Sequence, residues 1–132
     1  MKEEVCDRMR HHHRHVARAQ RHLDPGEPVL ASAVGRELAG RRGRVVLVTN
    51  TRVVVTWTRA APPEELSLLD CTATYDPGMH ILTLDDGGTM LSVGDVDPHA
   101  ARSVIECLSR HDRAVMQGPG GTLPHVRLVP TD

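Results

Sequence analysis

The chain has 132 residues, of which 39% are hydrophobic and 25% charged, and its formal net charge is −1. These values are typical of one globular domain and exclude a disordered chain, collagen and a coiled coil. With one Trp, one Tyr and no Phe, the predicted core is aliphatic.

The first predicted element is an amphipathic helix within residues 1–23. Residues 2–23 hold neither Gly nor Pro, and Asp24-Pro25-Gly26 then ends the pattern. A stripe recurs there at three- and four-residue steps: Val5, Met9, His12 or His13, Val16, Ala19 or Gln20, and Leu23. So narrow a stripe needs a partner surface, which we expect either on the same molecule or on a second copy.

Seven short strands follow at roughly ten-residue spacing. They are predicted over residues 29–34, 44–49, 52–58, 66–69, 71–75, 81–84 and 90–93. Turn residues separate them, among them Asn50-Thr51, Asp76-Pro77-Gly78 and Asp85-Asp86-Gly87-Gly88. This rhythm favours an antiparallel barrel or sandwich and not a sheet built from βαβ units.

A helix is predicted over residues 98–111. Asp97 is suited to cap it and Pro98 to occupy its first turn. Its apolar face, Ala101, Val104, Ile105 and Leu108, is expected to plug the open end of the strand layers. Residues 112–132, rich in Gly and Pro, are predicted to form a flexible tail.

Four segments in this order resemble a bacterial pleckstrin-homology-like domain over residues 24–111. They are GEPVLASAVG at 26–35, RVVLVTNTRVVVTW at 44–57, ELSLLDCTATY at 65–75 and LTLDDGGTMLSVGDVDPHAARSVIECL at 82–108. The resemblance implies a mainly β, α+β fold: a seven-stranded antiparallel barrel or sandwich with a C-terminal capping helix, here with an extra N-terminal helix. It implies no shared catalytic residues. Trp57 is the only aromatic residue where family members often place Phe or Trp.

The turn between the first two predicted strands is basic, with Arg36, Arg41, Arg42 and Arg44. In lipid-binding pleckstrin-homology domains the matching loop holds phosphoinositide headgroups, and the planar Arg fork suits phosphate. The resemblance therefore implies an anion- or lipid-binding site at these four residues. The alternative is a solvated turn, because fifteen of the sixteen Lys and Arg residues of this chain are Arg.

Asp7, His11 and His15 fall at helical steps of four, the spacing by which two His can share one zinc ion. Arginines at positions 8, 10, 14 and 18 would repel a cation there. We therefore predict neither a physiological metal site nor a cofactor.

The five histidines of the N-terminal helix, which lie among Arg side chains, predict one of two pH responses. If this helix docks onto the acidic half of the chain, their pKa values should rise and the helix should dock more tightly at mildly acidic pH; if it docks onto apolar surface, or does not dock, we expect the reverse or no change.

Charge is segregated along the chain: residues 35–59 carry +5 and residues 60–99 carry −8. Such asymmetry bears on partners, while a pI near 6.7 argues against nucleic-acid binding. No apolar run approaches the ~20 residues of a membrane span, and the N-terminal residues lack the apolar stretch of a secretory signal. Three widely spaced Cys suit a reducing compartment. We therefore expect a cytoplasmic protein, with peripheral membrane association as the alternative.

Nucleophile-elbow, phosphate-loop and zinc-protease motifs are missing. We therefore predict that the protein is not an enzyme. The expected function is a non-catalytic interaction module that binds a protein or peptide partner or associates with itself as a homo-oligomer. The alternative is peripheral binding to anionic lipid headgroups through the basic turn.

Overall fold

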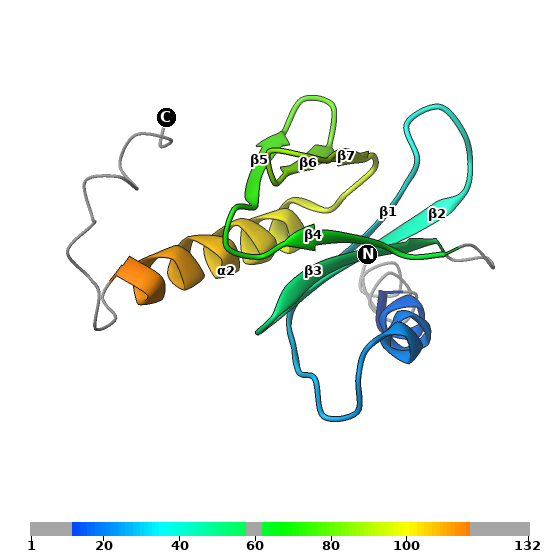
Figure 1. The fold of residues 1–132 in the computed structure, drawn as a ribbon. Helices are drawn as coiled ribbons and strands as arrows, with labels where there is room; N and C mark the ends of the chain where they lie inside the picture. Colours follow the sequence, from blue (N-terminus) through cyan, green and yellow to red (C-terminus); the bar gives the residue numbers. More distant parts are fainter. Residues whose placement is uncertain (1–11, 58–61, 117–132) are drawn as a thin grey trace.

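The structure is a computed structural model that describes residues 12–57 and 62–116, with side chains to residue 110. Its seven antiparallel strands form two sheets (Figure 1). The four-stranded sheet runs in the order β1 (Val29–Arg36), β2 (Gly43–Thr49), β3 (Arg52–Trp57), β4 (Glu64–Ser67), and the three-stranded sheet in the order β5 (Thr72–Asp76), β6 (Ile81–Asp85), β7 (Met90–Val93). The predicted mainly β sandwich of seven strands is confirmed.

The two sheets do not close into a barrel, so the barrel alternative is wrong. One backbone bridge joins them, in which the N–H groups of Arg36 and Gly94 each donate to the other residue's carbonyl, at 2.9 and 2.7 Å. At the opposite corner β4 and β5 are not paired. There the carboxylate of Asp86, in the β6–β7 turn, accepts the Ser67 N–H at 3.0 Å and so ties the turn to the end of β4.

The helix α2 (Pro98–Met116) begins at the predicted cap. Asp97 Oδ2 accepts the N–H groups of His99 and Ala100 at 3.0 and 3.2 Å. The predicted apolar face is confirmed, because Ala101, Val104 and Leu108 are buried in the main core. The helix continues to Met116, five residues beyond its predicted end. The predicted tail therefore begins inside it, and residues 117–132 lie outside the described part.

Residues 12–19 are α-helical and continue into a short 3-10 helix, η1 (Gln20–His22). Figure 1 shows this segment, which we call the N-terminal segment, against the four-stranded sheet. Ala19 is buried with Val45, Leu47 and Val54, and Val16 packs at the edge of the same cluster. The stripe therefore docks on the molecule's own sheet. Val5 and Met9 lie outside the described residues.

The four-stranded sheet is thus covered on both faces. Alternate residues of β2 divide between two apolar layers: Val46 and Val48 face the main core under α2, whereas Val45 and Leu47 face the N-terminal segment. This explains why residues 45–48 form a continuous apolar run and do not alternate with polar residues. Cys71 and Cys107 are both buried.

Strand boundaries differ from the prediction by more than one residue in two strands. β1 extends to Arg36 because that residue makes the bridge to Gly94. β4 spans Glu64–Ser67 because residues 68–70 form the turn to β5. Within the described ranges, no helix has both the length and the apolar character needed to cross a membrane.

Candidate functional site

Arg44, one of the four predicted anion-binding residues, is committed to contacts inside the molecule. Its Nη1 donates to the Ser92 carbonyl at 3.1 Å, and its Nη2 lies 3.8 Å from Glu64 Oε1. Its guanidinium carbon sits 4.1 Å from the centre of the Trp57 ring, a cation–π distance. With a side chain only 13% exposed, Arg44 is a structural residue.

The other three arginines of the turn do not converge on one point. Arg42 lies 5.5 Å from the Trp57 ring centre, and Arg36 Nε is 4.0 Å from Asp95 Oδ2. Arg41 and Arg42 are exposed. The structure therefore does not gather the predicted set of four into a single anion cradle.

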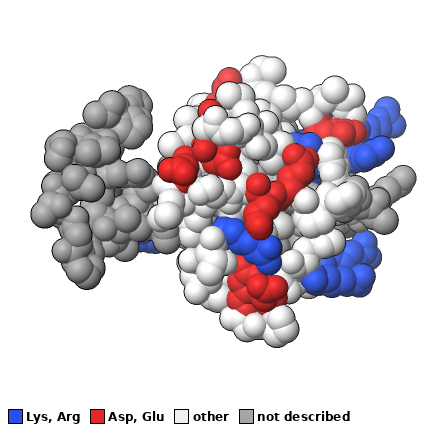
Figure 2. All heavy atoms as spheres, in the orientation of Figure 1, with Lys and Arg blue, Asp and Glu red and all other residues white. Residues whose placement is uncertain are grey.

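The basic and acidic segments of the chain pair with each other. Among the described side chains, three ion pairs join residues 35–57 to residues 62–99: Arg36–Asp95, Arg44–Glu64 and Arg52–Glu65. On the face drawn in Figure 2, basic and acidic groups accordingly adjoin near the centre. The segregation seen in the sequence is thus partly neutralised by folding, and this face is not of one sign.

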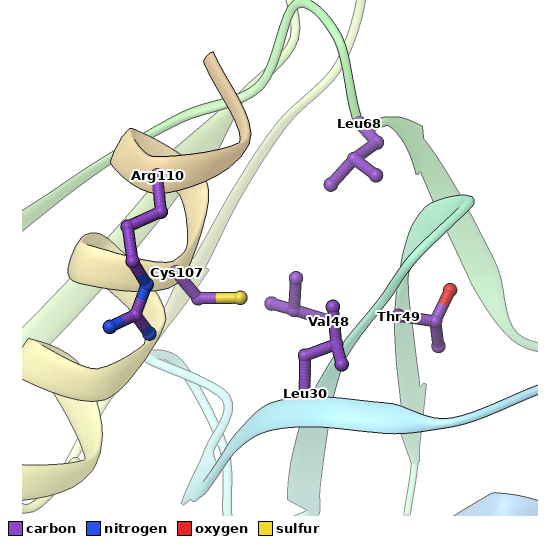
Figure 3. Close-up of a pocket in the computed structure, with 6 residues that line it drawn as sticks. All are labelled: Leu30, Val48, Thr49, Leu68, Cys107 and Arg110. Carbon is purple, nitrogen blue, oxygen red and sulfur yellow. The ribbon is translucent and has the colours of Figure 1, made fainter. Parts of the chain in front are cut away.

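A cavity of about 310 Å³ lies between α2 and the start of the four-stranded sheet (Figure 3). The sequence did not predict it. Its lining residues come from four segments: Leu30 from β1, Val48 and Thr49 from β2, Leu68 after β4, and Cys107 and Arg110 from α2. Val48, Leu68 and Cys107 are buried and form an apolar floor. In Figure 3 the Cys107 sulfur points toward Val48.

Leu30 reaches the cavity because of an irregularity in β1. Val29 pairs with Thr49 and Ala31 with Val48, so Leu30 is an extra residue with no partner on β2. Such a bulge redirects the side chain of the inserted residue. Leu30 remains 53% exposed, which leaves a large apolar side chain at the mouth of the cavity.

Thr49 offers the cavity no free polar group, because its hydroxyl already donates to Glu27 Oε2 at 2.7 Å. The Glu27 carboxylate also accepts from Arg52 Nη2 at 2.8 Å and Arg52 Nε at 3.0 Å. These Arg52 hydrogen bonds hold the pKa of Glu27 well below its ordinary value, against the opposing effect of burial. Glu27 and Arg52 therefore form an ion pair that is held in place beside Thr49.

Arg110 is the cationic residue of the cavity lining. It lies on the exposed side of α2, one helical turn after Glu106. In the part of the chain that the structure describes, its guanidinium makes no ion pair or hydrogen bond. The cavity therefore combines an apolar floor with one cation that is available to a ligand.

Of the three candidate metal ligands, Asp7 and His11 lie outside the described residues. His15 lies in the N-terminal segment and is partly buried. Among the described side chains no group of three or more His, Cys, Asp or Glu residues is arranged to hold a metal ion.

No protein-family model, curated protein or solved structure matches this chain. The sequence carried no sign of the cavity. Leu30, Val48 and Cys107 are ordinary apolar residues, and only the bulge at Leu30 and the crossing of α2 bring them together.

Proposed function

We propose that this chain is a non-catalytic interaction module with a pleckstrin-homology-like fold, and that it binds a protein or peptide partner at the cavity between α2 and the β1–β2 strands. The proposal for the fold is supported by the order of elements, which is four strands in one sheet, three in the next, then a helix against both. The cavity carries the proposal for the function.

The lining suits recognition of an apolar side chain. Val48, Leu68 and Cys107 are buried beneath the opening, and Leu30 stands 53% exposed beside it. Because the three floor residues are at most 6% exposed, the apolar surface that a partner would remove from water belongs mainly to Leu30, at about 25 cal/mol for each Å². A partner that inserts one aliphatic side chain would gain most from this surface.

Self-association through the N-terminal stripe loses support, because Val16 and Ala19 already pack on the molecule's own sheet. Light scattering at high micromolar concentration measures this directly. A monomer there leaves a different protein or a peptide as the partner, whereas a dimer would make a second copy the partner.

Anionic lipid headgroups remain a second candidate ligand, favoured by the exposure of Arg41 and Arg42 at the β1–β2 loop. Exposed basic residues near an anionic surface contribute about 1 kcal/mol each. Co-sedimentation with vesicles rich in phosphatidylserine at low salt tests it, and protein left entirely in the supernatant rejects it.

The cavity itself is tested with a matched pair of variants. Leu30→Ser removes the apolar rim, while Leu38→Ser removes an equally exposed leucine (56%) from the β1–β2 loop. Both variants and the parent chain are screened against one library of short peptides by fluorescence anisotropy. We expect Leu30→Ser to lose the peptides that the parent and Leu38→Ser bind. Equal binding by all three would contradict the proposed site.

A further inference from the structure

The mouth of the cavity carries an unused positive charge. Arg44 and Arg52, whose side chains are 13% and 25% exposed, are matched by carboxylates, Arg44 by Glu64 and Arg52 by Glu27 and Glu65, whereas Arg110 is exposed. Arg110 has no such acidic partner among the described residues, although it lines the cavity. An anionic group on a bound ligand would supply one.

We propose that the cavity binds the C-terminal residue of a partner protein, with its aliphatic side chain on the apolar floor and its α-carboxylate against Arg110. This inference rests on the proposed function and names the partner's chemistry at the same site. The planar guanidinium fork can bond both oxygens of a carboxylate.

The size of the cavity favours a C-terminus over an internal acidic residue. A C-terminal Leu or Val bears its apolar side chain and its carboxylate on one Cα atom, so both fit a space of about 310 Å³. An internal Asp or Glu would need a neighbouring residue to fill the floor, and both flanking chains would have to leave the same opening. The bulged Leu30 already covers part of that opening.

The test is an NMR titration of the isotope-labelled full chain with three probes. They are acetyl-Ala-Ala-Leu with a free carboxylate, the same peptide as its amide, and acetyl-Ala-Ala-Ala with a free carboxylate. We expect the free-acid Leu peptide to shift the signals of Leu30, Val48 and Cys107 and to bind about fivefold more tightly than the amide, the upper value for an exposed ion pair. The Ala peptide should bind more weakly than either.

Two variants of α2 separate the role of charge at the cavity from charge in general. Arg110→Gln should make the acid and the amide bind equally, while Arg102→Gln, an exposed arginine of the same helix, should preserve the difference. If acid and amide bind the parent equally and Arg110→Gln changes nothing, the C-terminal assignment is overturned while the apolar docking site stands. If no probe shifts the lining residues, the proposed function fails as well.

One further outcome assigns the ligand elsewhere. Decanoate that shifts the cavity signals when the peptides do not would identify a small amphiphile and overturn the protein partner.

Discussion

The carboxylate of Glu27 and the guanidinium of Arg52 form a two-point ion pair across 25 residues of sequence, with Oε1–Nη2 at 2.8 Å and Oε2–Nε at 3.0 Å. The Glu27 side chain is 4% exposed. It also accepts hydrogen bonds from the hydroxyl groups of Thr49 and Thr51. This network fastens the segment before β1 to the β2–β3 hairpin.

Replacing Glu27 with Gln should lower the free energy of unfolding by about 2–3 kcal/mol, because several hydrogen bonds to a charged, buried acceptor are lost. Urea denaturation measures the change. Glu65→Gln is the matched control: Glu65 also pairs with Arg52, at 3.2 Å, but its side chain is 50% exposed. Its loss should cost less than about 1 kcal/mol. Equal effects of the two substitutions would show that the network adds nothing beyond a surface ion pair.

Acid should destabilise the protein through the same group. The hydrogen bonds from Arg52 lower the pKa of Glu27 below its ordinary value of 4.5, and those from the Ser67, Thr89 and Gly88 N–H groups lower the pKa of Asp86. A carboxylate with a depressed folded-state pKa contributes stability that is present above its unfolded pKa and is lost as pH falls toward the folded value. Stability should therefore decline below about pH 4.5.

Denaturation curves between neutral pH and pH 3 test this decline, and Glu27→Gln should show a shallower one than the parent chain. Identical slopes would mean that Glu27 titrates alike in the folded and unfolded states.

The N-terminal segment should loosen at mildly acidic pH. Burial lowers the pKa of His12, the neighbouring His13 lowers it further, and Asp97 opposes them. Its Nε2 is 2.9 Å from the Ser32 hydroxyl of β1. Because the folded-state pKa is depressed, the docked segment is fully stable above pH 6.5 and loses stability as the pH falls through that value. Of the two pH responses that the sequence left open, this is the one expected for docking on apolar surface.

NMR titration of the ring protons between pH 5 and 8 measures the His12 pKa. His12→Gln should remove the pH dependence of the exchange protection in residues 12–19, while His99→Gln, at an exposed position on α2, should not. A His12 pKa above 6.5 would contradict the assignment.

Most elements could be predicted because local chemistry determines them. The β2–β3 hairpin turns at Asn50-Thr51 and α2 begins at Asp97-Pro98, as the turn and cap residues indicate. The apolar stripe of the N-terminal helix could also be predicted, but the surface that it packs on could not, because a continuous apolar run such as residues 45–48 does not indicate what covers each face of the strand. The sequence also did not predict that the sandwich is open between β4 and β5. Which strand edges pair depends on contacts between residues that are distant in sequence.

The candidate site was less predictable for the same reason. The arginines of the β1–β2 turn suggested an anion site, yet Arg44 finds Glu64 and the Ser92 carbonyl, 20 and 48 residues away. Spacing within the turn carries no information on such partners. Likewise Leu30 lines a cavity only because β1 bulges there.

Removing Arg44 should destabilise the fold, because its guanidinium joins Trp57, Glu64 and the Ser92 carbonyl. Arg44→Gln is expected to cost about 1–3 kcal/mol, from a charged hydrogen bond and a cation–π contact. Arg41→Gln, at an exposed position of the same turn, should stay within about 0.5 kcal/mol. The emission of Trp57, the only Trp, reports the change. A larger effect at Arg41 than at Arg44 would contradict the structural role.

The junction of the two sheets should be sensitive to a single methyl group at Gly35. A Cβ atom there would lie 2.7 Å from Val93 Cγ1 and 2.9 Å from Val96 Cγ2, and would also clash with the Gly94 carbonyl, which is backbone and cannot swing away. Gly35→Ala should therefore push β1 from the loop after β7 and cost about 1–3 kcal/mol, as overpacking of a core does.

Gly78→Ala is the control for that substitution, because its Cβ would meet nothing closer than Asp76 Oδ1 at 3.4 Å. Its effect should remain within about 0.5 kcal/mol, as for most surface changes. Urea denaturation gives both values, and amide exchange of Arg36 and Gly94 shows whether their bridge opens in Gly35→Ala. Since that bridge is the backbone link between the sheets in the described residues, its exchange should accelerate more than that of the β2–β3 hairpin. Unchanged protection at Arg36 and Gly94, with unchanged stability, would mean that the sheets are held together elsewhere.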